Sequence, residues 1–235
     1  MNLINLVLYQ SCNQSCKHCP MKQWIYAPNA VDANGNKLNA LTNEIILNWY
    51  DKYIDPNICL TQINGGEPAL YPEINTLIPA LTKRGHKGIV LTNGSLYVPQ
   101  SDNFKRCAAW HMGYDMPKYY DLILILKNPY EDWQKKVEHC KQNNIMYEVF
   151  EFQYFNDENA PALREIDPYI NPEYIDYVST IYASGTMAGC PSAAVIEGKS
   201  ILKMSEPEMY PIKEKCPHCQ TVRAFEVFCK RFNIL

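Results

Sequence analysis

The chain has 235 residues, of which 47% are hydrophobic and 20% are charged, and its formal net charge is −3. This composition is that of an ordinary globular protein, long enough to bury a core without disulfides, and it excludes a disordered or collagen-like chain. Nucleic-acid-binding domains usually carry an excess of basic residues, so the slightly acidic balance argues against nucleic acid as a partner.

Ten cysteines are the most informative feature of the composition. No uncharged apolar stretch approaches the ~20 residues of a transmembrane helix, and the apolar run at residues 3–8 is too short for a secretory signal. We therefore expect a cytoplasmic protein that binds no membrane and keeps its thiols reduced. Clustered cysteines in such a protein are more often metal ligands or catalytic groups than disulfides.

Strand and helix patterns alternate along the first 182 residues. Strands are predicted at residues 3–9, 58–63, 88–91, 121–126, 145–152 and 175–182, and helices at 42–54, 72–84, within 101–112 and at 130–142. This alternation indicates parallel βαβ units, but a complete eightfold barrel takes about 250 residues. We therefore predict an α/β fold, a partial (β/α)6 barrel of TIM type over residues 1–182, followed by a small cysteine-rich domain over residues 183–235.

The unusual residues of the chain fall at one edge of this barrel. Active sites of parallel barrels lie at the C-terminal ends of the strands. The motifs at the ends of the first four predicted strands are Cys12 with Cys16 and Cys19, Gly65-Gly66-Glu67-Pro68, Thr92-Asn93-Gly94 and Lys127-Asn128. We expect these motifs to share one site.

Cys12, Cys16 and Cys19 are three thiols in one loop, and no fourth cysteine is near. Thiolates suit zinc and iron–sulfur clusters. Closed zinc sites and four-iron clusters normally take four protein ligands, so three ligands leave one metal position open for a substrate or cofactor. The alternative is a structural zinc site that His18 or Cys59 completes.

The cysteine spacing Cys-x-x-x-Cys-x-x-Cys after a first strand, with Gly-Gly-Glu-Pro after the second, resembles the radical S-adenosylmethionine (radical SAM) superfamily. The resemblance implies that Cys12, Cys16 and Cys19 are the catalytic cysteines and hold a 4Fe-4S cluster. S-adenosylmethionine would chelate the fourth iron and be cleaved reductively to a 5′-deoxyadenosyl radical, which abstracts hydrogen from a substrate. An electron donor such as flavodoxin or ferredoxin is the implied partner.

The resemblance also implies which residues contact S-adenosylmethionine near the cluster. His18 stands before the last cysteine, where the family usually has an aromatic residue. Gly65 and Gly66 allow a close approach of backbone to ligand, and Glu67 and the strand-end carbonyls offer acceptors to the ammonium group. A plain strand-to-helix turn is the alternative for this segment.

Further round the barrel, Thr92 and Asn93 resemble the third-strand ending of many family members. Lys127 and Asn128 replace the polar Ser-x-Asp-like ending that the family often has on its fourth strand. Lys127 is available to pair with the carboxylate of S-adenosylmethionine, and a solvated strand end is the alternative.

The tail contains a second group of cysteines, Cys190, Cys216, Cys219 and Cys229. This group resembles the SPASM and twitch extensions of radical SAM enzymes, which carry auxiliary clusters. It implies a second 4Fe-4S cluster, a possible electron acceptor for the substrate radical, and a zinc knob is the alternative. The other cysteines, at positions 59, 107 and 140, stand alone, and we expect them to fill the core.

These features predict an oxidoreductase-type radical SAM enzyme. Only eleven residues precede Cys12, which leaves no room for a domain that grips a leader peptide and favours a small-molecule substrate. Modification of a peptide, as in the maturation of ribosomally made peptide products, is the alternative within the family. The alternative from another class is a non-catalytic zinc-binding interaction module.

Overall fold

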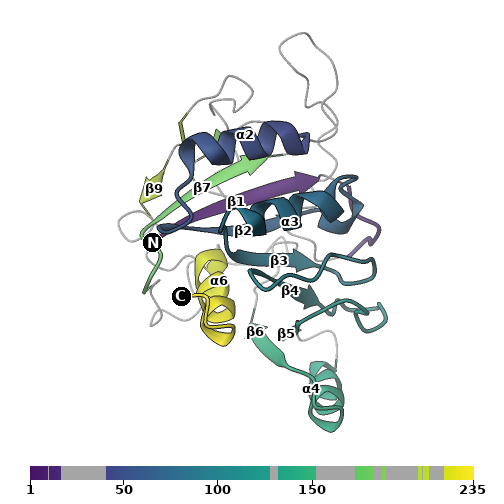
Figure 1. Cartoon of the computed structure of the whole chain (residues 1–235). Coiled ribbons are helices and arrows are strands. Elements are labelled where there is room, and N and C mark those ends of the chain that lie inside the picture. Colours follow the sequence, from purple (N-terminus) through teal and green to yellow (C-terminus); the bar gives the residue numbers. More distant parts are fainter. Residues whose placement is uncertain are drawn as a thin grey trace, which may run out of the picture.

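The computed structural model describes residues 1–9, 11–16, 41–127, 132–151, 173–182, 187–188, 206–207, 209–211 and 220–235. In this part of the chain, one sheet has helices packed on both of its faces (Figure 1). The elements are β1 (Asn2–Tyr9), α2 (Asn43–Tyr53), β2 (Cys59–Gly65), the 3-10 turn η1 (Pro68–Leu70), α3 (Ile74–Lys83), β3 (Gly88–Thr92), β4 (Phe104–Ala109), β5 (Leu122–Lys127), α4 (Trp133–Gln142), β6 (Tyr147–Glu151), β7 (Tyr177–Tyr182), β8 (Met187–Ala188), β9 (Tyr210–Pro211) and α6 (Gln220–Arg231).

The sheet is mostly parallel, with the strand order β6-β5-β4-β3-β2-β1-β7-β8 and with β9 paired to β7. Strands β1 to β7 run parallel to their neighbours, and the short β8 and β9 run antiparallel to β7. The predicted α/β fold class is therefore confirmed, and the parallel order suits a partial barrel. Since β7 pairs with β1 and not with β6, the described strands do not form a closed barrel.

One predicted element is wrong, because residues 104–109 form strand β4 where the sequence predicts a helix within 101–112. Adjacent charged residues, Lys105 and Arg106, obscure the alternation of the strand. Arg106 is nevertheless buried, because its guanidinium pairs with Asp121 at 2.7 Å and its backbone N–H donates to the same carboxylate. The sheet therefore contains one more parallel strand than the sequence analysis predicts.

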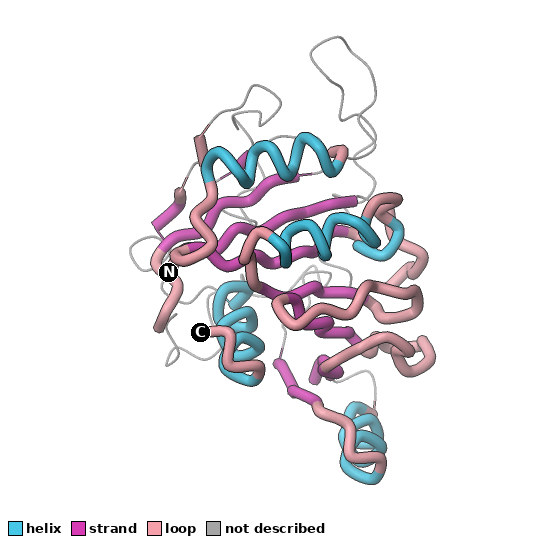
Figure 2. The backbone as a smooth tube through the Cα atoms, viewed as in Figure 1, coloured by secondary structure: helices cyan, strands magenta, loops and turns pink. Residues whose placement is uncertain are grey.

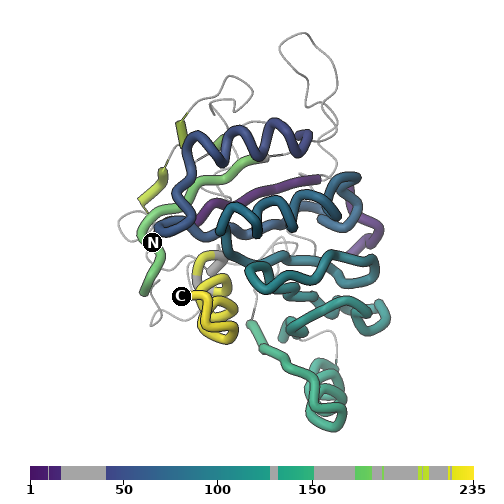
Figure 3. The backbone as a smooth tube through the Cα atoms, in the orientation of Figure 1, coloured from purple at the N-terminus to yellow at the C-terminus, as the bar shows by residue number. Residues whose placement is uncertain are grey.

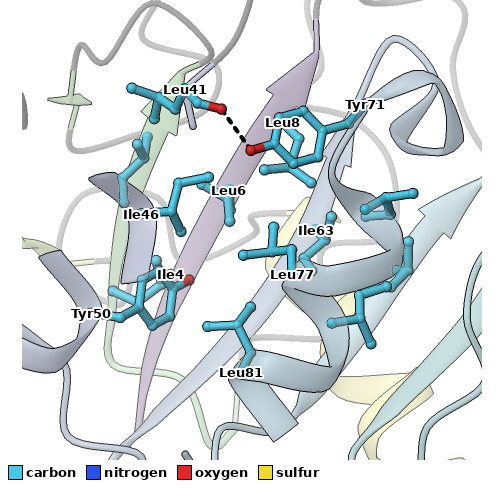
Figure 4. Close-up of a cluster of buried hydrophobic side chains, with 14 of the residues drawn as sticks. Ile4, Leu6, Leu8, Leu41, Ile46, Tyr50, Ile63, Tyr71, Leu77 and Leu81 are labelled. Atoms are coloured by element: carbon cyan, nitrogen blue, oxygen red, sulfur yellow. Dashed lines mark hydrogen bonds between the residues drawn. The ribbon is translucent and has the colours of Figure 1, made fainter. Parts of the chain in front are cut away.

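Helices α2 and α3 cover the outer face of the sheet (Figure 4). Their buried side chains recur every three or four residues, as expected of helices with one apolar face, and they pack on alternate residues of β1. The main contributors are Ile46, Trp49 and Tyr50 of α2, Leu77, Ile78 and Leu81 of α3, and Ile4, Leu6 and Leu8 of β1. The Tyr71 hydroxyl donates to the Leu41 carbonyl at 2.6 Å and fixes the start of α2.

Helix α6 packs on the inner face, over the starts of the strands. Its apolar residues share one buried cluster with residues near the beginning of β1, β2, β3 and β5. The cluster includes Val222, Phe225, Phe228 and Cys229 of α6 and Leu3, Leu60, Ile89 and Leu122 of the sheet. Helix α6 therefore covers the amino-terminal part of β1 and β2 on the inner face, and its cluster extends toward the ends of β3 to β6 through Leu91, Ala109, Leu126 and Phe150.

A buried carboxylate attaches α6 to the segment that leads into β7. Glu226 is 4% exposed, and its oxygens accept the backbone N–H groups of Glu173, Tyr174 and Ile175 at 2.9, 2.7 and 2.7 Å. Burial of a carboxylate is tolerated only with such donors. These three bonds therefore fix the position of α6 under the sheet.

The described parts of residues 183–235 share the sheet and the core with the barrel, through β8, β9 and α6. The predicted domain boundary after residue 182 stays a prediction. Cys59, Cys107 and Cys140 are buried in three different apolar clusters, which confirms that they fill the core. Among the helices described, none is both long enough and apolar enough to span a bilayer.

We expect Glu226→Ala to lower the free energy of unfolding by about 2–4 kcal/mol, because the buried N–H of Ile175 loses its acceptor at ~1–3 kcal/mol and the partly buried N–H groups of Glu173 and Tyr174 lose theirs at a smaller cost. Urea denaturation followed by circular dichroism measures the change.

Lys230→Ala is the matched control, since Lys230 lies on the same helix and pairs with Glu173 at an exposed position. The Lys230→Ala variant should lose less than about 1 kcal/mol of unfolding free energy. Equal losses for the two variants would show that Glu226 does not anchor the helix.

Candidate active site

The segments that follow β1, β2, β3 and β4 meet at the carboxyl edge of the sheet (Figures 2 and 3). Backbone bonds hold the segment after β1 against that after β2, since Gly66 N–H donates to the Tyr9 carbonyl at 2.7 Å and Glu67 N–H to the Ser11 carbonyl at 2.9 Å. On the other side, Ser15 N–H donates to the Tyr114 hydroxyl at 2.6 Å. The first two cysteines thus lie where the topology brings these four loops together.

Gly65 is required by the close approach of two backbones. Its φ is +143°, and a Cβ at this position would lie 2.4 Å from the Tyr9 carbonyl oxygen. Only glycine both adopts this positive φ readily and lacks the Cβ that would collide with the carbonyl oxygen. The glycine pair therefore lets the end of β2 run directly beside the chain that leads to Cys12.

Glu67 is fully buried, and its carboxylate is bonded by the protein itself. One oxygen accepts the Ala69 N–H at 2.9 Å and the Thr92 hydroxyl at 2.6 Å, and the other accepts the Asn93 N–H at 2.7 Å. Burial raises the pKa of Glu67, while the bonds from Asn93, Thr92 and Ala69 oppose that rise. The carboxylate thus joins the ends of β2 and β3, whereas the sequence analysis assigns it to the ammonium group of a ligand.

Asn93 connects the end of β3 to the cysteine segment. Its Nδ2 donates to Asn13 Oδ1 at 2.7 Å and lies 3.9 Å from Cys12 Sγ, within reach of an N–H···S bond. Its Oδ1 accepts the N–H and the hydroxyl of Ser95 at 3.0 and 2.6 Å. The predicted partners Thr92 and Asn93 therefore lie in one network with Glu67 and Cys12.

The two described cysteines of the motif form a small polar turn. Cys12 Sγ accepts the Gln14 N–H at 3.4 Å, and Cys16 Sγ lies 3.7 Å from Gln14 Oε1. Burial raises the pKa of the Cys12 thiol, and the Gln14 N–H opposes that rise. N–H donors aimed at Cys12 sulfur, with the Cys16 thiol in the same turn, suit a thiolate-bound metal, which deprotonates its ligands.

No group of three potential metal ligands gathers within the described ranges. Cys19, the predicted third ligand, lies outside these ranges, as do His18, Asn128, Cys190, Cys216 and Cys219. The roles predicted for those residues stay predictions.

Lys127 is found at the end of β5, as predicted, on the far side of β4 from Asn93. Its ammonium lies 5.9 Å from the centroid of the Trp133 ring, at the first turn of α4. The ammonium is thus placed at the carboxyl edge, and its predicted contact with a carboxylate stays a prediction.

Cys229, predicted as a ligand of a second cluster, lies at the other end of the molecule's inner face. It is fully buried on α6 in the apolar cluster that contains Phe225, Phe228 and Cys107. Burial raises the pKa of its thiol, and nearby Glu226 adds to the effect. Its described neighbours are those of a core residue, and its predicted role as a metal ligand stays a prediction.

A layer of uncharged polar side chains crosses the inner face between α6 and the cysteines. Asn5 Oδ1 accepts from Gln62 Nε2 at 3.0 Å and from Asn64 Nδ2 at 2.7 Å, and Asn5 Nδ2 donates to the Thr180 hydroxyl at 3.4 Å. Asn5, Gln62 and Thr180 are paired in register on β1, β2 and β7, and all three are buried. This polar layer places amide groups, without a charge, below the carboxyl edge.

Sequence reasoning did not identify Asn13, Ser95 or Tyr114 as parts of the site. Tyr114 follows β4, and the incorrect helix prediction conceals that a strand ends just before it. Asn13 lies between Cys12 and Gln14, and Ser95 follows Thr92-Asn93-Gly94, so only their positions beside the two motifs could have identified them.

No family model matches the chain, and no curated protein sequence does. Among solved structures, Streptococcus suis SuiB bound to S-adenosylmethionine matches with a TM-score of 0.55 and 15% identity, over 84% of this chain and 60% of SuiB. Another SuiB crystal structure gives 0.50 and 11% identity, over 86% and 63% of the two chains. BtrN in complex with AdoMet and 2-DOIA gives 0.48 and 12% identity, over 99% and 88%.

The match to SuiB establishes the fold. This chain has the architecture of a structure that was solved with S-adenosylmethionine bound, and it spans 60% of the length of that protein.

We expect Glu67→Ala to lower the free energy of unfolding by about 3 kcal/mol or more, because three donors, two of them backbone N–H groups, lose their shared acceptor. Thermal unfolding of the variant and the parent protein measures the change.

Glu138→Ala is the control for Glu67→Ala, since the Glu138 carboxylate bonds only an exposed neighbour on the same helix, Gln142, in the contacts described. It should leave stability within about 0.5 kcal/mol of the parent. A Glu67 variant as stable as this control would mean that the carboxylate does not hold the two loops.

Proposed function

We propose that the chain is a radical SAM enzyme of oxidoreductase type, in which Cys12, Cys16 and Cys19 hold a 4Fe-4S cluster. When bound, the cluster and S-adenosylmethionine supply a 5′-deoxyadenosyl radical that abstracts hydrogen from a substrate. One observation carries the proposal: the carboxyl edge of a SuiB-like barrel brings Cys12 and Cys16 together with the Gly-Gly-Glu and Thr-Asn-Gly segments.

The residues around the cysteines have separate tasks in this proposal. Gly65, Gly66 and the Glu67 carboxylate shape the end of β2, so that its backbone carbonyls face the ammonium group of S-adenosylmethionine. Thr92 and Asn93 support that loop from β3, and His18, which precedes Cys19 in the sequence, is proposed to contact the cofactor. Lys127 and Asn128, at the end of β5, are the proposed partners of the cofactor's carboxylate, because an ammonium pairs well with an anion.

The polar layer supports an uncharged polar substrate. Asn5, Gln62 and Thr180 are at most 1% exposed and belong with Asn64 to one hydrogen-bonded set below the cysteines, and among the described residues no Asp, Glu, Lys or Arg joins this set. A buried ionic group without a partner costs far more than a hydrogen-bonded neutral one. We therefore favour a small neutral molecule, with a peptide as the alternative substrate.

The tail cysteines are proposed to hold a second, SPASM- or twitch-like 4Fe-4S cluster that accepts an electron from the substrate radical. Cys190, Cys216 and Cys219 are its ligands in this proposal. Cys229 is left in the apolar core, where the structure has it. A donor of the flavodoxin or ferredoxin class supplies the electron that begins the reaction.

Metal and product analysis of anaerobically reconstituted protein tests the proposal. We expect about eight irons and little zinc per chain, and 5′-deoxyadenosine when S-adenosylmethionine and dithionite are added. Joint replacement of Cys12, Cys16 and Cys19 by Ala should leave about four irons and abolish 5′-deoxyadenosine. Zinc as the main metal, or iron-loaded protein that forms no 5′-deoxyadenosine, would refute the enzyme and favour the zinc-binding interaction module.

The same analysis tests Cys229 separately. Because Cys229 lies in the apolar core, Cys229→Ala should keep the full iron content and only lower the stability of the fold. Cys216→Ala, the comparison variant, should lose about four irons. A folded Cys229→Ala protein that loses as much iron as Cys216→Ala would make Cys229 a ligand.

A further inference from the structure

We propose that Asn93 is a positioning residue whose side-chain amide donates an N–H to Cys12 Sγ and thereby raises the reduction potential of the cluster held there. This inference rests on the proposed function, because it concerns the same cluster. It assigns to Asn93 an effect on how readily the cluster accepts the electron that precedes cleavage of S-adenosylmethionine.

The contacts of Asn93 decide which end of its amide faces the sulfur. The backbone N–H of Ser95 can only donate, and it lies 3.0 Å from Asn93 Oδ1, so the atom at that position must be the oxygen. The Ser95 hydroxyl bonds the same oxygen at 2.6 Å. The NH2 group is therefore turned toward the cysteine segment.

The NH2 group has two hydrogens and two acceptors within reach. One hydrogen serves Asn13 Oδ1 at 2.7 Å, and the other is left for Cys12 Sγ at 3.9 Å. Asn93 is 6% exposed, so water competes little for this donor. The amide can thus bond the sulfur and hold the residue next to it at the same time.

The backbone of Asn93 is held as firmly as its side chain. Its N–H donates to the fully buried Glu67 carboxylate at 2.7 Å, and the next residue, Gly94, turns the chain with a φ of +64°. The Gly94 N–H returns to the Thr92 hydroxyl at 3.0 Å. The donor is therefore fixed relative to β3, and a substitution of the side chain leaves this backbone network in place.

Hydrogen bonds to the sulfurs of an iron–sulfur cluster favour its reduced, more negative form and so raise its potential. Among the described residues, the donors to Cys12 are the backbone N–H groups of Gln14 and Asn13 and the side-chain Nδ2 of Asn93. The first two belong to the backbone, so Asn93 is the donor that a side-chain substitution removes. The reduction itself adds one electron from the external donor and forms or breaks no bond.

A redox titration followed by electron paramagnetic resonance tests the inference. The loop cluster is recognised as the one whose signal changes when S-adenosylmethionine is added. Asn93→Leu should keep the iron content and shift the midpoint to a more negative potential. A three- to tenfold change in the oxidised-to-reduced ratio corresponds to ~30–59 mV for one electron.

Two further variants separate the bond to sulfur from the loop's architecture. Asn93→Asp keeps an oxygen for Ser95 but places a carboxylate beside the sulfur, so it should lower the potential at least as much as Asn93→Leu. If the Asn93→Leu protein does not bind iron, the midpoint potential of the Asn93→Asp protein tests the inference instead. Ser95→Ala removes the hydroxyl on Asn93 Oδ1 but keeps the Ser95 N–H on that oxygen, so it should shift the potential less than Asn93→Leu does.

The inference is overturned if the iron-loaded Asn93 variants titrate at the parent's potential, or if Ser95→Ala shifts the potential as much as they do. In either case a parent protein that still cleaves S-adenosylmethionine leaves the proposed function intact. A parent protein with no loop cluster would instead defeat the proposed function.

Discussion

A buried carboxylate organises the carboxyl edge of this barrel. Glu67 follows β2 with no exposure to solvent, and the hydrogen bonds that it accepts come from its own turn and from the end of β3. Loss of the acceptor leaves buried donors unpaired, which costs free energy. The network therefore holds the ends of the two strands together. Asn93, fixed in this way, reaches the cysteine segment, and the position of Cys12 therefore depends on Glu67 without direct contact between their reactive atoms.

The inner face of the sheet changes character along the strands. On β1, β2 and β7 it is apolar near the starts of the strands and carries the polar layer around Asn5 further along, whereas Leu91, Leu126 and Phe150 keep it apolar toward the ends of β3, β5 and β6. A reactive radical needs surroundings that exclude water and hold its target close. The apolar cluster under α6 and the buried polar layer exclude water below the cysteines, which suits the proposed reaction.

Much of this arrangement could be predicted from the sequence, because strand ends and glycines leave clear patterns. Residues 3–9, 58–63 and 88–91 were recognisable as strands, and the motifs after them do meet in space. The direction of the Glu67 side chain could not be predicted, since acceptors for a ligand and for a neighbouring loop look the same in sequence. The sequence did not indicate strand β4, because Lys105 and Arg106 obscure its alternation. The ion-pair partner of Arg106, Asp121, lies 15 residues further along the chain. The spacing of the tail cysteines predicts Cys229 as a metal ligand. Its position in the apolar cluster depends on how α6 packs against the sheet, which could not be predicted from the sequence.

The central claim is that iron, held by the cysteines after β1, lies at the carboxyl edge of the sheet. Anomalous diffraction from anaerobic crystals, recorded above and below the iron and zinc absorption edges, tests it without reference to a substrate. The account predicts an iron peak within bonding distance of Cys12 Sγ and Cys16 Sγ, beside the Gly-Gly-Glu segment. A zinc peak at that position, or no metal there in protein that carries iron elsewhere, would contradict it.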